Sequence, residues 1–317
     1  MIQKRIVIIG GGTGTFTVLG ALKKLPVHLT AIVSMADDGG STGILRDQYG
    51  VLPPGDIRRA LVALSPRSAT LRKLFTYRFK NGDFGGHAFG NIFLSVMEKI
   101  EGNFARAVKE TARILDISGD VIPVTLDSVR LIARLTDKSF VVGETNIDIP
   151  RSGARKPIAS VWLDPRARIN PDARRAIQKA HTIIIGPGDL YTSIVPNLLV
   201  DGVSESIKKS KAVKIYVGNL MTKRGETDSY KAPDFLKTME KYLGTGIFNY
   251  VLFNNKKPAQ KILARYRKEG AKFVIISNLK KNSRKPAIIL TDLLASGNFI
   301  RHDLAKLGAA LKPLIER

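Results

Sequence analysis

The stretch RIVIIGGGTGTFTVLGAL, residues 5–22, decides the fold class. Its opening, residues 5–9, is apolar after the arginine, which is typical of a strand covered on both faces in a parallel sheet. Residues 16–25 have the apolar spacing of a helix. The glycines between these segments permit positive φ angles and the close approach of another molecule, and the helix start presents unpaired N–H groups. This order of strand, glycine-rich turn and helix predicts a corner that holds a phosphate.

Five residues would form this phosphate corner: Gly11, Gly12, Thr13, Gly14 and Thr15. The dinucleotide fingerprint G-x-G-x-x-G would need glycine at position 15 or 17, and threonine occupies both. No Gly-Lys-Ser/Thr follows, so a Walker-type phosphate loop is not indicated either. A tight strand-to-helix turn without a ligand is the alternative interpretation, and the glycines favour the phosphate.

The composition indicates a globular protein. With 317 residues and 44% hydrophobic residues, the chain can bury a sizeable core. It has no apolar run of transmembrane length, and residues 1–5 lead into the first strand without a signal-peptide region. We therefore expect a cytoplasmic protein without membrane insertion. The lack of cysteine excludes disulfides and thiolate metal sites, and only four histidines are present, so any metal would be bound by oxygen.

The formal net charge of +24 invites an interpretation as a nucleic-acid-binding protein. The Lys and Arg residues are, however, scattered through IKKSKAVK (207–214), NNKKPAQK (254–261), RKEG (267–270) and NLKKNSRK (278–285), without interleaved aromatic residues. We therefore interpret most of the charge as solvated helix faces and loops, and expect no nucleic-acid partner.

Strands alternate with helices along most of the chain. The period changes at about residues 119–163, where four short β runs separated by turns predict a small antiparallel insertion. The parts on either side are predicted to share one Rossmann-like, doubly wound, mainly parallel α/β sheet, because parallel strands need right-handed crossovers and a shared covered surface. Residues 1–317 would then form a single nucleotide-binding domain that carries the insertion.

Five predicted strands end in polar, glycine-rich sequence. These ends are IIGGGTGT (8–15), VSMADDGGSTG (33–43), IIIGPGDLYTSIVPN (183–197), YVGNLMTKRGETD (216–228) and VLFNN (251–255). In open α/β sheets, ligands bind beyond the carboxyl ends of the strands, at the switch in strand order. Five such ends on one sheet edge predict a long cleft for an extended polar ligand.

Two adjacent carboxylates, Asp37 and Asp38, follow the second predicted strand. In this position a carboxylate can accept hydrogen bonds from ribose hydroxyls or hold Mg²⁺ through oxygen. Gly39 and Gly40 after them can contribute to a second amide-lined anion nest. The alternative is a turn followed by a helix cap. Mg²⁺ bound by the two aspartates is the only cofactor that this pattern suggests, and none is required.

The other loops at this edge supply further candidate ligands. The segment GPGDLYTSIVPN offers backbone amides, a tyrosine ring and two hydroxyls for a phosphate or sugar, and the last two strand ends add amide and hydroxyl side chains. These candidates are Gly186, Pro187, Gly188, Asp189, Tyr191, Thr192, Ser193, Asn219, Thr222 and Asn254.

Two helix starts have both a functional and a structural interpretation. His87 and Asn91 lie four residues apart and share one helix face, which either meets the ligand or holds a satisfied histidine. In PPGDIRR, Asp56 is predicted to cap the following helix. Arg58 and Arg59 could bind a phosphate, and the sequence does not favour this interpretation over a structural one.

The C-terminal stretch ASGNFIRHDLAKL, residues 295–307, supplies one more candidate. Asp303 is predicted to cap the final helix, and Arg301 lies just before that cap. Arg301 would supply a fixed positive charge for a diphosphate, with bidentate geometry. The alternative is a solvated arginine.

The motifs IGGGTGT, MADDGGSTG, LPPGDIRRALVAL, GHAFGNIFL, IIIGPGDLYTSIVPNLLV, NLMTKRGETD and FIRHDLAKL together resemble the gluconeogenesis factor (YvcK-like) branch of the CofD-like superfamily. The likeness runs in matching order from about residue 5 to residue 310. It implies a Rossmann-like fold and a role in bacterial carbon metabolism, cell shape and peptidoglycan precursor supply. The ligand that it implies is a UDP-sugar, notably UDP-N-acetylglucosamine.

The sister branch of this superfamily, 2-phospho-L-lactate transferase, joins a phosphate-linked lactyl group to a deazaflavin with Mg²⁺ and releases GMP. By that resemblance, Gly11 to Gly14 would form the phosphate loop and Asp37 and Asp38 the carboxylates. An Mg²⁺-dependent transferase is therefore one alternative function, and an NAD(P)-binding protein is another, weakened by the missing third glycine. No catalytic residue is assigned, and the oligomeric state stays open, with a homo-oligomer among the options.

Overall fold

The computed structural model describes residues 3–66, 69–150, 155–277 and 286–316. The basic run at 278–285 lies outside the described residues. The main sheet contains β1 (Lys4–Gly10), β2 (Val27–Val33), β3 (Asp120–Pro123), β7 (Thr182–Ile185), β8 (Val213–Val217), β9 (Tyr250–Asn254) and β10 (Ala287–Thr291).

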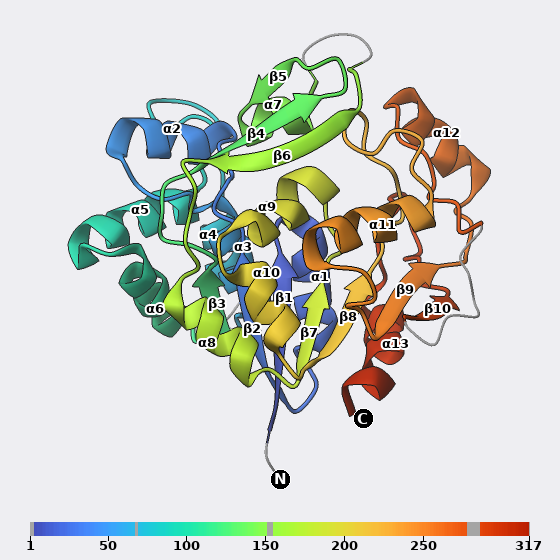
Figure 1. The fold of residues 1–317 in the computed structure, drawn as a ribbon. Coiled ribbons are helices and arrows are strands. Elements are labelled where there is room, and N and C mark those ends of the chain that lie inside the picture. The colour runs from blue at the N-terminus through green and yellow to red at the C-terminus, as the bar shows by residue number, and fades with distance from the viewer. Residues whose placement is uncertain (1–2, 67–68, 151–154, 278–285, 317) are drawn as a thin grey trace.

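The seven strands of this sheet lie in the order β10-β9-β8-β7-β1-β2-β3, and every pairing is parallel. The chain starts in the middle at β1, runs out to β3, returns to β7 beside β1, and then proceeds to β10 (Figure 1). This topology confirms the predicted doubly wound, mainly parallel sheet. The strand order reverses between β1 and β7, so the loops after these two strands flank the switch point where ligands of such folds bind.

Helices cover both faces of the sheet. They are α1 (Gly12–Leu22), α2 (Gly40–Tyr49), α3 (Gly55–Leu64), α4 (Ala69–Thr76), α5 (Phe89–Glu101), α6 (Phe104–Ile114), α7 (Glu144–Asp148), α8 (Pro171–Lys179), α9 (Val195–Leu199), α10 (Val203–Lys209), α11 (Ala232–Leu243), α12 (Gln260–Lys268) and α13 (Leu304–Glu316). Helices α1, α3 and α13 pack together on one face, and α8, α10 and α11 on the other (Figure 1). Within the described ranges, no helix has the length and apolar character needed to cross a membrane.

The central strand β1 shows why the opening stretch decides the fold. Ile6, Val7, Ile8 and Ile9 are at most 1% exposed, because helices cover both of its faces and strands pair on both of its sides. Burying one such side chain contributes about 1.5–3 kcal/mol relative to leaving it exposed. A strand with no polar alternation can lie only at such a place.

Helix α1 begins at Gly12, four residues before the predicted start at residue 16. Gly11 has an extended backbone, with φ −159° and ψ −177°, and the helix begins immediately after it. The Thr15 hydroxyl also donates to the Gly11 carbonyl oxygen at 3.1 Å, which supports this first turn. Glycine and threonine are poor helix formers, so residue preferences gave no sign of it.

The predicted antiparallel insertion is partly corrected by the structure. Residues 120–123, expected in it, form β3 and pair in parallel with β2, with Thr30 opposite Asp120. The antiparallel sheet consists of β4 (Arg130–Leu135), β5 (Phe140–Val142) and β6 (Ile158–Asp164) in the order β5-β4-β6. A four-residue apolar run does not reveal its partner, because periodicity gives no strand direction. The small sheet and α7 lie over the carboxyl ends of the main-sheet strands (Figure 1).

Candidate functional site

A cavity of about 560 Å³ opens at the carboxyl edge of the main sheet. The start of α1 and the loop after β7 form one side, and the loop after β8 and residues 300–302 form another. Residues 148–150, at the end of α7 in the segment that joins β5 to β6 of the small antiparallel sheet, also line the cavity. Eight sequence-predicted residues line it: Thr13, Gly14, Pro187, Gly188, Asp189, Asn219, Thr222 and Arg301.

The loops on the two sides of the switch point touch at Gly14. A Cβ atom there would lie 2.2 Å from the carbonyl oxygen of Pro187, which is closer than real atoms approach. Glycine at position 14 therefore lets the first turn of α1 pack against the loop after β7. The sequence predicts that this glycine lets a phosphate approach, and the group that approaches it in the structure is the protein's own second loop.

Thr13 lines the cavity with Gly14, whereas Gly11, Gly12 and Thr15 of the predicted corner lie outside it. The Gly12 amide donates to the Asp56 carboxylate at 2.9 Å, and a Cβ on Gly11 would meet the same carboxylate at 2.6 Å. Asp56 was expected to cap its own helix, but α3 begins after Pro54 without a side-chain cap. The Asp56 side chain instead reaches α1 and accepts a hydrogen bond from one of the amides that a helix start leaves without a partner in the helix. Burial raises the pKa of Asp56, against the lowering effects of Arg59 and the Gly12 amide.

Asp38 holds α7 in place. Its two oxygens accept hydrogen bonds from the amides of Glu144 at 3.2 Å and Thr145 at 2.9 Å. Asp37 accepts from the Gly39 amide at 2.9 Å, and burial, together with Asp56, raises the pKa of Asp37 to about 6. Neither aspartate lines the cavity. The loop after β2 therefore shapes the site through α7.

Gly39 and Gly40, predicted as part of an anion nest, form the start of α2, with Gly39 as its N-cap. His87 and Asn91 join a buried network below this start. The Ser41 hydroxyl lies 3.2 Å from Nδ1 of His87, and Asn91 donates to it at 3.1 Å. This network ties α2 to α5, and it lies apart from the cavity.

Arg58 extends the same network, since its Nε donates to the Asn91 side-chain oxygen at 2.8 Å and another nitrogen donates to the Phe75 carbonyl. Arg59 is partly exposed and pairs with Asp56 at 3.4 Å. Arg58 and Arg59 therefore both bond to other groups of the protein in this structure.

The loop after β7 continues into a short π-helix, η1 (Leu190–Ile194), whose side chains are buried. The Tyr191 hydroxyl lies 3.0 Å from the hydroxyl of Tyr230, and Thr192 donates to Glu226 at 2.9 Å. Ser193 accepts from Asn197 through its backbone oxygen at 2.9 Å. These groups hold the loop that presents the cavity wall.

Two further predicted ligands also lie away from the cavity. Gly186 has a φ of +73° and packs beneath the loop after β7, where a Cβ would meet the Val217 carbonyl at 2.9 Å. Asn254 at the end of β9 is buried, and its side chain bonds with the backbone of Lys256 and Leu293. Both residues serve the neighbouring backbone.

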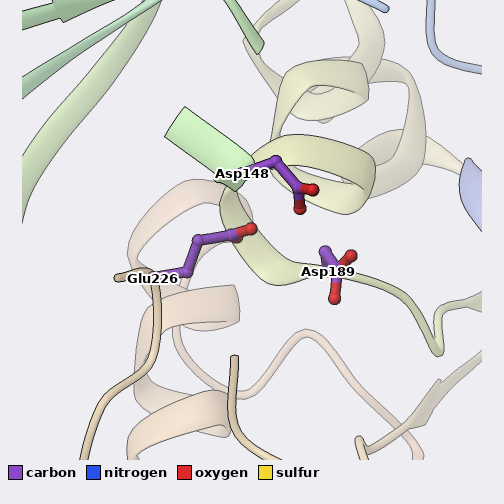
Figure 2. Close-up of side chains that lie close together, drawn as sticks. All are labelled: Asp148, Asp189 and Glu226. Atoms are coloured by element: carbon purple, nitrogen blue, oxygen red, sulfur yellow. The ribbon is translucent and has the colours of Figure 1, made fainter. Parts of the chain in front are cut away.

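A carboxylate cluster that the sequence did not reveal lies at the cavity wall, with Asp148 and Asp189 lining the cavity and Glu226 buried beside them. One oxygen of each of Asp148, Asp189 and Glu226 lies within 4.8 Å of the others (Figure 2). They come from the end of α7, the loop after β7 and the loop after β8, and only Asp189 had been singled out. Among the residues that the structure describes, this is the group of three acidic or histidine side chains with metal-binding proximity.

Lys223 neutralises part of this cluster. Its Nζ lies 2.7 Å from Asp148 and 3.5 Å from Asp189. Burial and Asp189 raise the pKa of Glu226 to about 8, and burial raises that of Asp189. Burial alone would lower the pKa of Lys223, but Asp189 and Asp148 outweigh it and raise that pKa. Three carboxylates are suitable ligands for a divalent cation such as Mg²⁺. In this structure the Lys223 ammonium occupies part of that role, because it pairs with Asp148 and Asp189.

Three further polar side chains line the cavity. The Asn219 amide nitrogen donates to the Gly188 carbonyl at 2.8 Å, while its oxygen is buried with no partner among the described residues. The Arg301 guanidinium lies 5.3 Å from the centre of the Phe299 ring and borders the cavity. Burial lowers the pKa of His302 to about 4, so this imidazole is neutral. Asp303 caps α13 as predicted, accepting from the Lys306 amide at 2.9 Å.

A doubly wound sheet with a polar cavity at its switch point defines the class of Rossmann-like α/β proteins. Comparison with known proteins narrows this class. The family model described as 2-phospho-L-lactate transferase CofD matches residues 6–294. The chain belongs to the CofD family and, within it, to the gluconeogenesis factors.

Relatives match over nearly the whole chain. A putative gluconeogenesis factor of Thermotoga maritima is 44% identical over 313 residues, covering 97% of this chain and 98% of that protein. The gluconeogenesis factor of Bacillus subtilis is 40% identical over 318 residues, 99% of each chain. A crystal structure of a UPF0052 family member from Bacillus halodurans has a TM-score of 0.93 and 40% identity, and covers 98% of this chain and 99% of its own. The resemblance noted in the sequence is thereby confirmed.

Proposed function

We propose that the protein binds a nucleotide sugar, UDP-N-acetylglucosamine, in the cavity at the switch point. One observation carries this proposal: the first turn of α1, the loop after β7 and Arg301 border the same 560 Å³ space. Backbone amides at a helix start suit a diphosphate, and an arginine suits its charge. The cavity volume lies in the range that ligand sites of this kind occupy.

The polar groups of the cavity fit an extended ligand. Thr13 and Gly14 would face the diphosphate, and Arg301 would pair with it from the C-terminal segment. The unpaired oxygen of Asn219 would accept a hydrogen bond from a sugar or ribose hydroxyl, because a buried acceptor without a partner is costly. Thr222 lies along the same wall and offers a hydroxyl.

The ligand's negative charge needs compensation at one end of the cavity. Asp148, Asp189 and Glu226 stand there with one ammonium, Lys223, between them. An added diphosphate beside three carboxylates is repelled unless these groups are protonated or bound to cations. We infer that the diphosphate lies toward Thr13 and Arg301, and that uncharged hydroxyls of the ligand face the carboxylate cluster.

As a gluconeogenesis factor, the protein would use this site in carbon metabolism. A UDP-sugar ligand would link it to peptidoglycan precursor supply and cell shape, in the cytoplasm, where such nucleotides occur. These roles follow from the family resemblance and the ligand proposed here. No catalytic act is part of this proposal.

A thermal-shift panel tests the ligand class. UDP-N-acetylglucosamine, UDP, GDP, NAD⁺, NADP⁺ and a deazaflavin are each compared with buffer. A ligand at 100 times its dissociation constant stabilises the folded state by about 2.7 kcal/mol. We expect the UDP-sugar to give the largest shift. Stabilisation by NAD(P)⁺ alone would instead identify a dinucleotide-binding protein.

A second candidate function rests on the carboxylate cluster: an Mg²⁺-dependent transferase like 2-phospho-L-lactate transferase. Asp148, Asp189 and Glu226 would hold the ion, which would stabilise charge on a transferred phosphate. Asp37 and Asp38, the ligands suggested by the sequence, bond amides of the protein instead. Binding of the ion would require Lys223 to move off these carboxylates.

Titration with Mg²⁺ separates the two functions. Under the transferase proposal, Mg²⁺ binds to the wild type and product forms from a nucleotide-linked donor and a deazaflavin, and Asp148→Asn loses both. Asp83→Asn, which changes an exposed carboxylate outside the cavity, serves as the matched control. Nucleotide-sugar binding that is independent of Mg²⁺, with no turnover, would reject the transferase and leave the binding protein.

A further inference from the structure

One surface of the molecule exposes a concentration of large apolar side chains. Tyr49, Tyr77, Phe84, Val96 and Ile100 are 57%, 53%, 56%, 51% and 70% exposed. We call these five residues the apolar patch. They belong to α2, α5 and the segment between α4 and α5, and α2 and α5 lie side by side in Figure 1. Contiguous apolar surface of this kind marks an interaction site more often than single exposed residues do.

The members of the patch are connected to one another. Tyr49, Phe84 and Val96 line a common groove of about 440 Å³. The ring of Phe79 lies 5.2 Å from that of Tyr77 and 5.5 Å from that of Phe84, and so joins them. Ile100 follows Val96 by one helical turn, on the same face of α5.

Phe84 is presented by a hydrogen-bonded loop. The Phe79 amide donates to the His87 carbonyl at 2.9 Å, and the Gly86 amide donates back to Phe79 at 2.9 Å. Gly82 and Gly86 have φ angles of +74° and +83°, which L side chains adopt at a cost, so glycine suits both turns. The loop therefore holds the aromatic ring outward although water surrounds it.

Basic residues surround the patch. Lys73, Arg78, Lys80 and Lys99 are all exposed. The first three lie within RKLFTYRFK, residues 72–80, where basic residues are interleaved with aromatic and aliphatic ones, and Lys99 on α5 lines the groove. The exposed acidic residue within the loop is Asp83.

We propose that this surface docks on an anionic lipid surface. The basic residues would bind phosphate headgroups, each contributing about 1 kcal/mol near such a surface, while Phe84, Tyr77 and Ile100 would enter the interfacial region. The net charge of +24 favours an anionic partner and opposes a second copy, which would bring the same basic residues against one another. Nucleic-acid bases stack on aromatic side chains, whereas this patch mixes aliphatic with aromatic side chains. Such a mixture is better suited to contact with acyl chains.

Vesicle co-sedimentation tests the proposal directly. The full chain is mixed with vesicles of phosphatidylcholine alone, or of phosphatidylcholine with phosphatidylglycerol, at about 0.15 M salt. We expect binding to the anionic vesicles only. Replacing Lys73 and Lys80 by glutamine should weaken it roughly fivefold per residue, the factor that corresponds to about 1 kcal/mol each. Phe84→Ser with Ile100→Ser should weaken it while leaving its salt dependence in place.

Matched controls keep the test specific to this surface. Phe140→Ser removes an equally exposed ring, 63% exposed, on β5, and Lys261→Gln with Lys268→Gln removes two exposed charges on α12. All variants should melt at the wild-type temperature without ligand. Equal loss in the controls, or no binding by the wild type, would overturn the proposal. A dimer in sedimentation analysis that Phe84→Ser with Ile100→Ser abolishes would overturn it in favour of self-association.

Discussion

Single residues at the glycine corner have different tasks although they stand side by side. Gly12 gives its amide to Asp56, and Gly14 lets the loop after β7 approach. Thr13 between them faces the cavity. The corner therefore makes contacts within the protein on one side and forms part of the cavity wall on the other. Substitutions at neighbouring positions should have different effects.

Gly12→Ala should destabilise the fold. Gly12 has a φ of +61°, and a Cβ there would lie 3.1 Å from the Ser193 hydroxyl. A non-glycine residue in this conformation costs about 1–2 kcal/mol. Denaturant unfolding measures the loss, and Gly40→Ala is the control, because Gly40 also has a positive φ, +43°, but open space around it. An unfolding midpoint for Gly12→Ala equal to that of the wild type would contradict the predicted destabilisation. If Gly12→Ala loses more stability than Gly40→Ala, the difference measures the effect of crowding against Ser193.

At the scale of elements, the small antiparallel sheet is tied to the site through α7. Asp38, in the loop after β2, accepts hydrogen bonds from the first two amides of α7. Asp148, the last residue of α7, pairs with Lys223. The short helix thus spans from one loop of the main sheet to another. Its position determines where Asp148 of the carboxylate cluster lies.

Asp38→Ala should loosen α7 and weaken ligand binding without unfolding the main sheet. Loss of a side-chain acceptor at a helix start costs about 0.5–2 kcal/mol. Hydrogen exchange should quicken at the Glu144 and Thr145 amides, and Asp38→Asn, which keeps one acceptor oxygen, should show a smaller effect. Asp137→Ala, in the turn between β4 and β5, is the control. Unchanged exchange at residues 144–148 would remove Asp38 from this role.

The sequence revealed the fold better than it revealed the site. Apolar runs such as residues 5–9, followed by glycine-rich ends, were enough to predict the parallel sheet and its binding edge, because strand burial leaves a local pattern. The carboxylate cluster left none: Asp148 and Lys223 lie 75 positions apart in the sequence and meet only through the fold. Asp56 was assigned to its own helix for the same reason, since its partner Gly12 is 44 residues away.

For the whole molecule, buried carboxylates at one edge predict an unusual pH dependence. Burial and Asp37 raise the pKa of Glu144 to about 9, and burial raises the pKa values of Glu226 and Asp37 to about 8 and about 6. A carboxyl whose pKa is raised by folding stabilises the protein fully below its ordinary value of about 4. That stability is lost as the pH rises through the raised value.

The melting temperature should therefore fall between about pH 5 and pH 9. Glu144→Gln should flatten this fall, because it removes the group with the highest raised pKa among the three. Glu205→Gln, an exposed glutamate paired with Lys209, should leave the slope unchanged. A melting temperature that rises with pH across this window would contradict the raised pKa values of Glu144, Glu226 and Asp37.

Isothermal titration of UDP-N-acetylglucosamine into the wild type and a pair of arginine variants tests the central claim most directly. Arg301 and Arg265 both lie over the Phe299 ring, at 5.3 and 5.0 Å, but only Arg301 of the two lines the cavity. We predict that the wild type and Arg265→Ala bind the ligand alike, and that Arg301→Ala binds more weakly by about 1.5–3 kcal/mol, the range for a hydrogen bond to a charged group. Arg301→Glu should bind more weakly still. No binding by the wild type, or wild-type affinity in Arg301→Glu, would contradict a nucleotide-sugar site in this cavity.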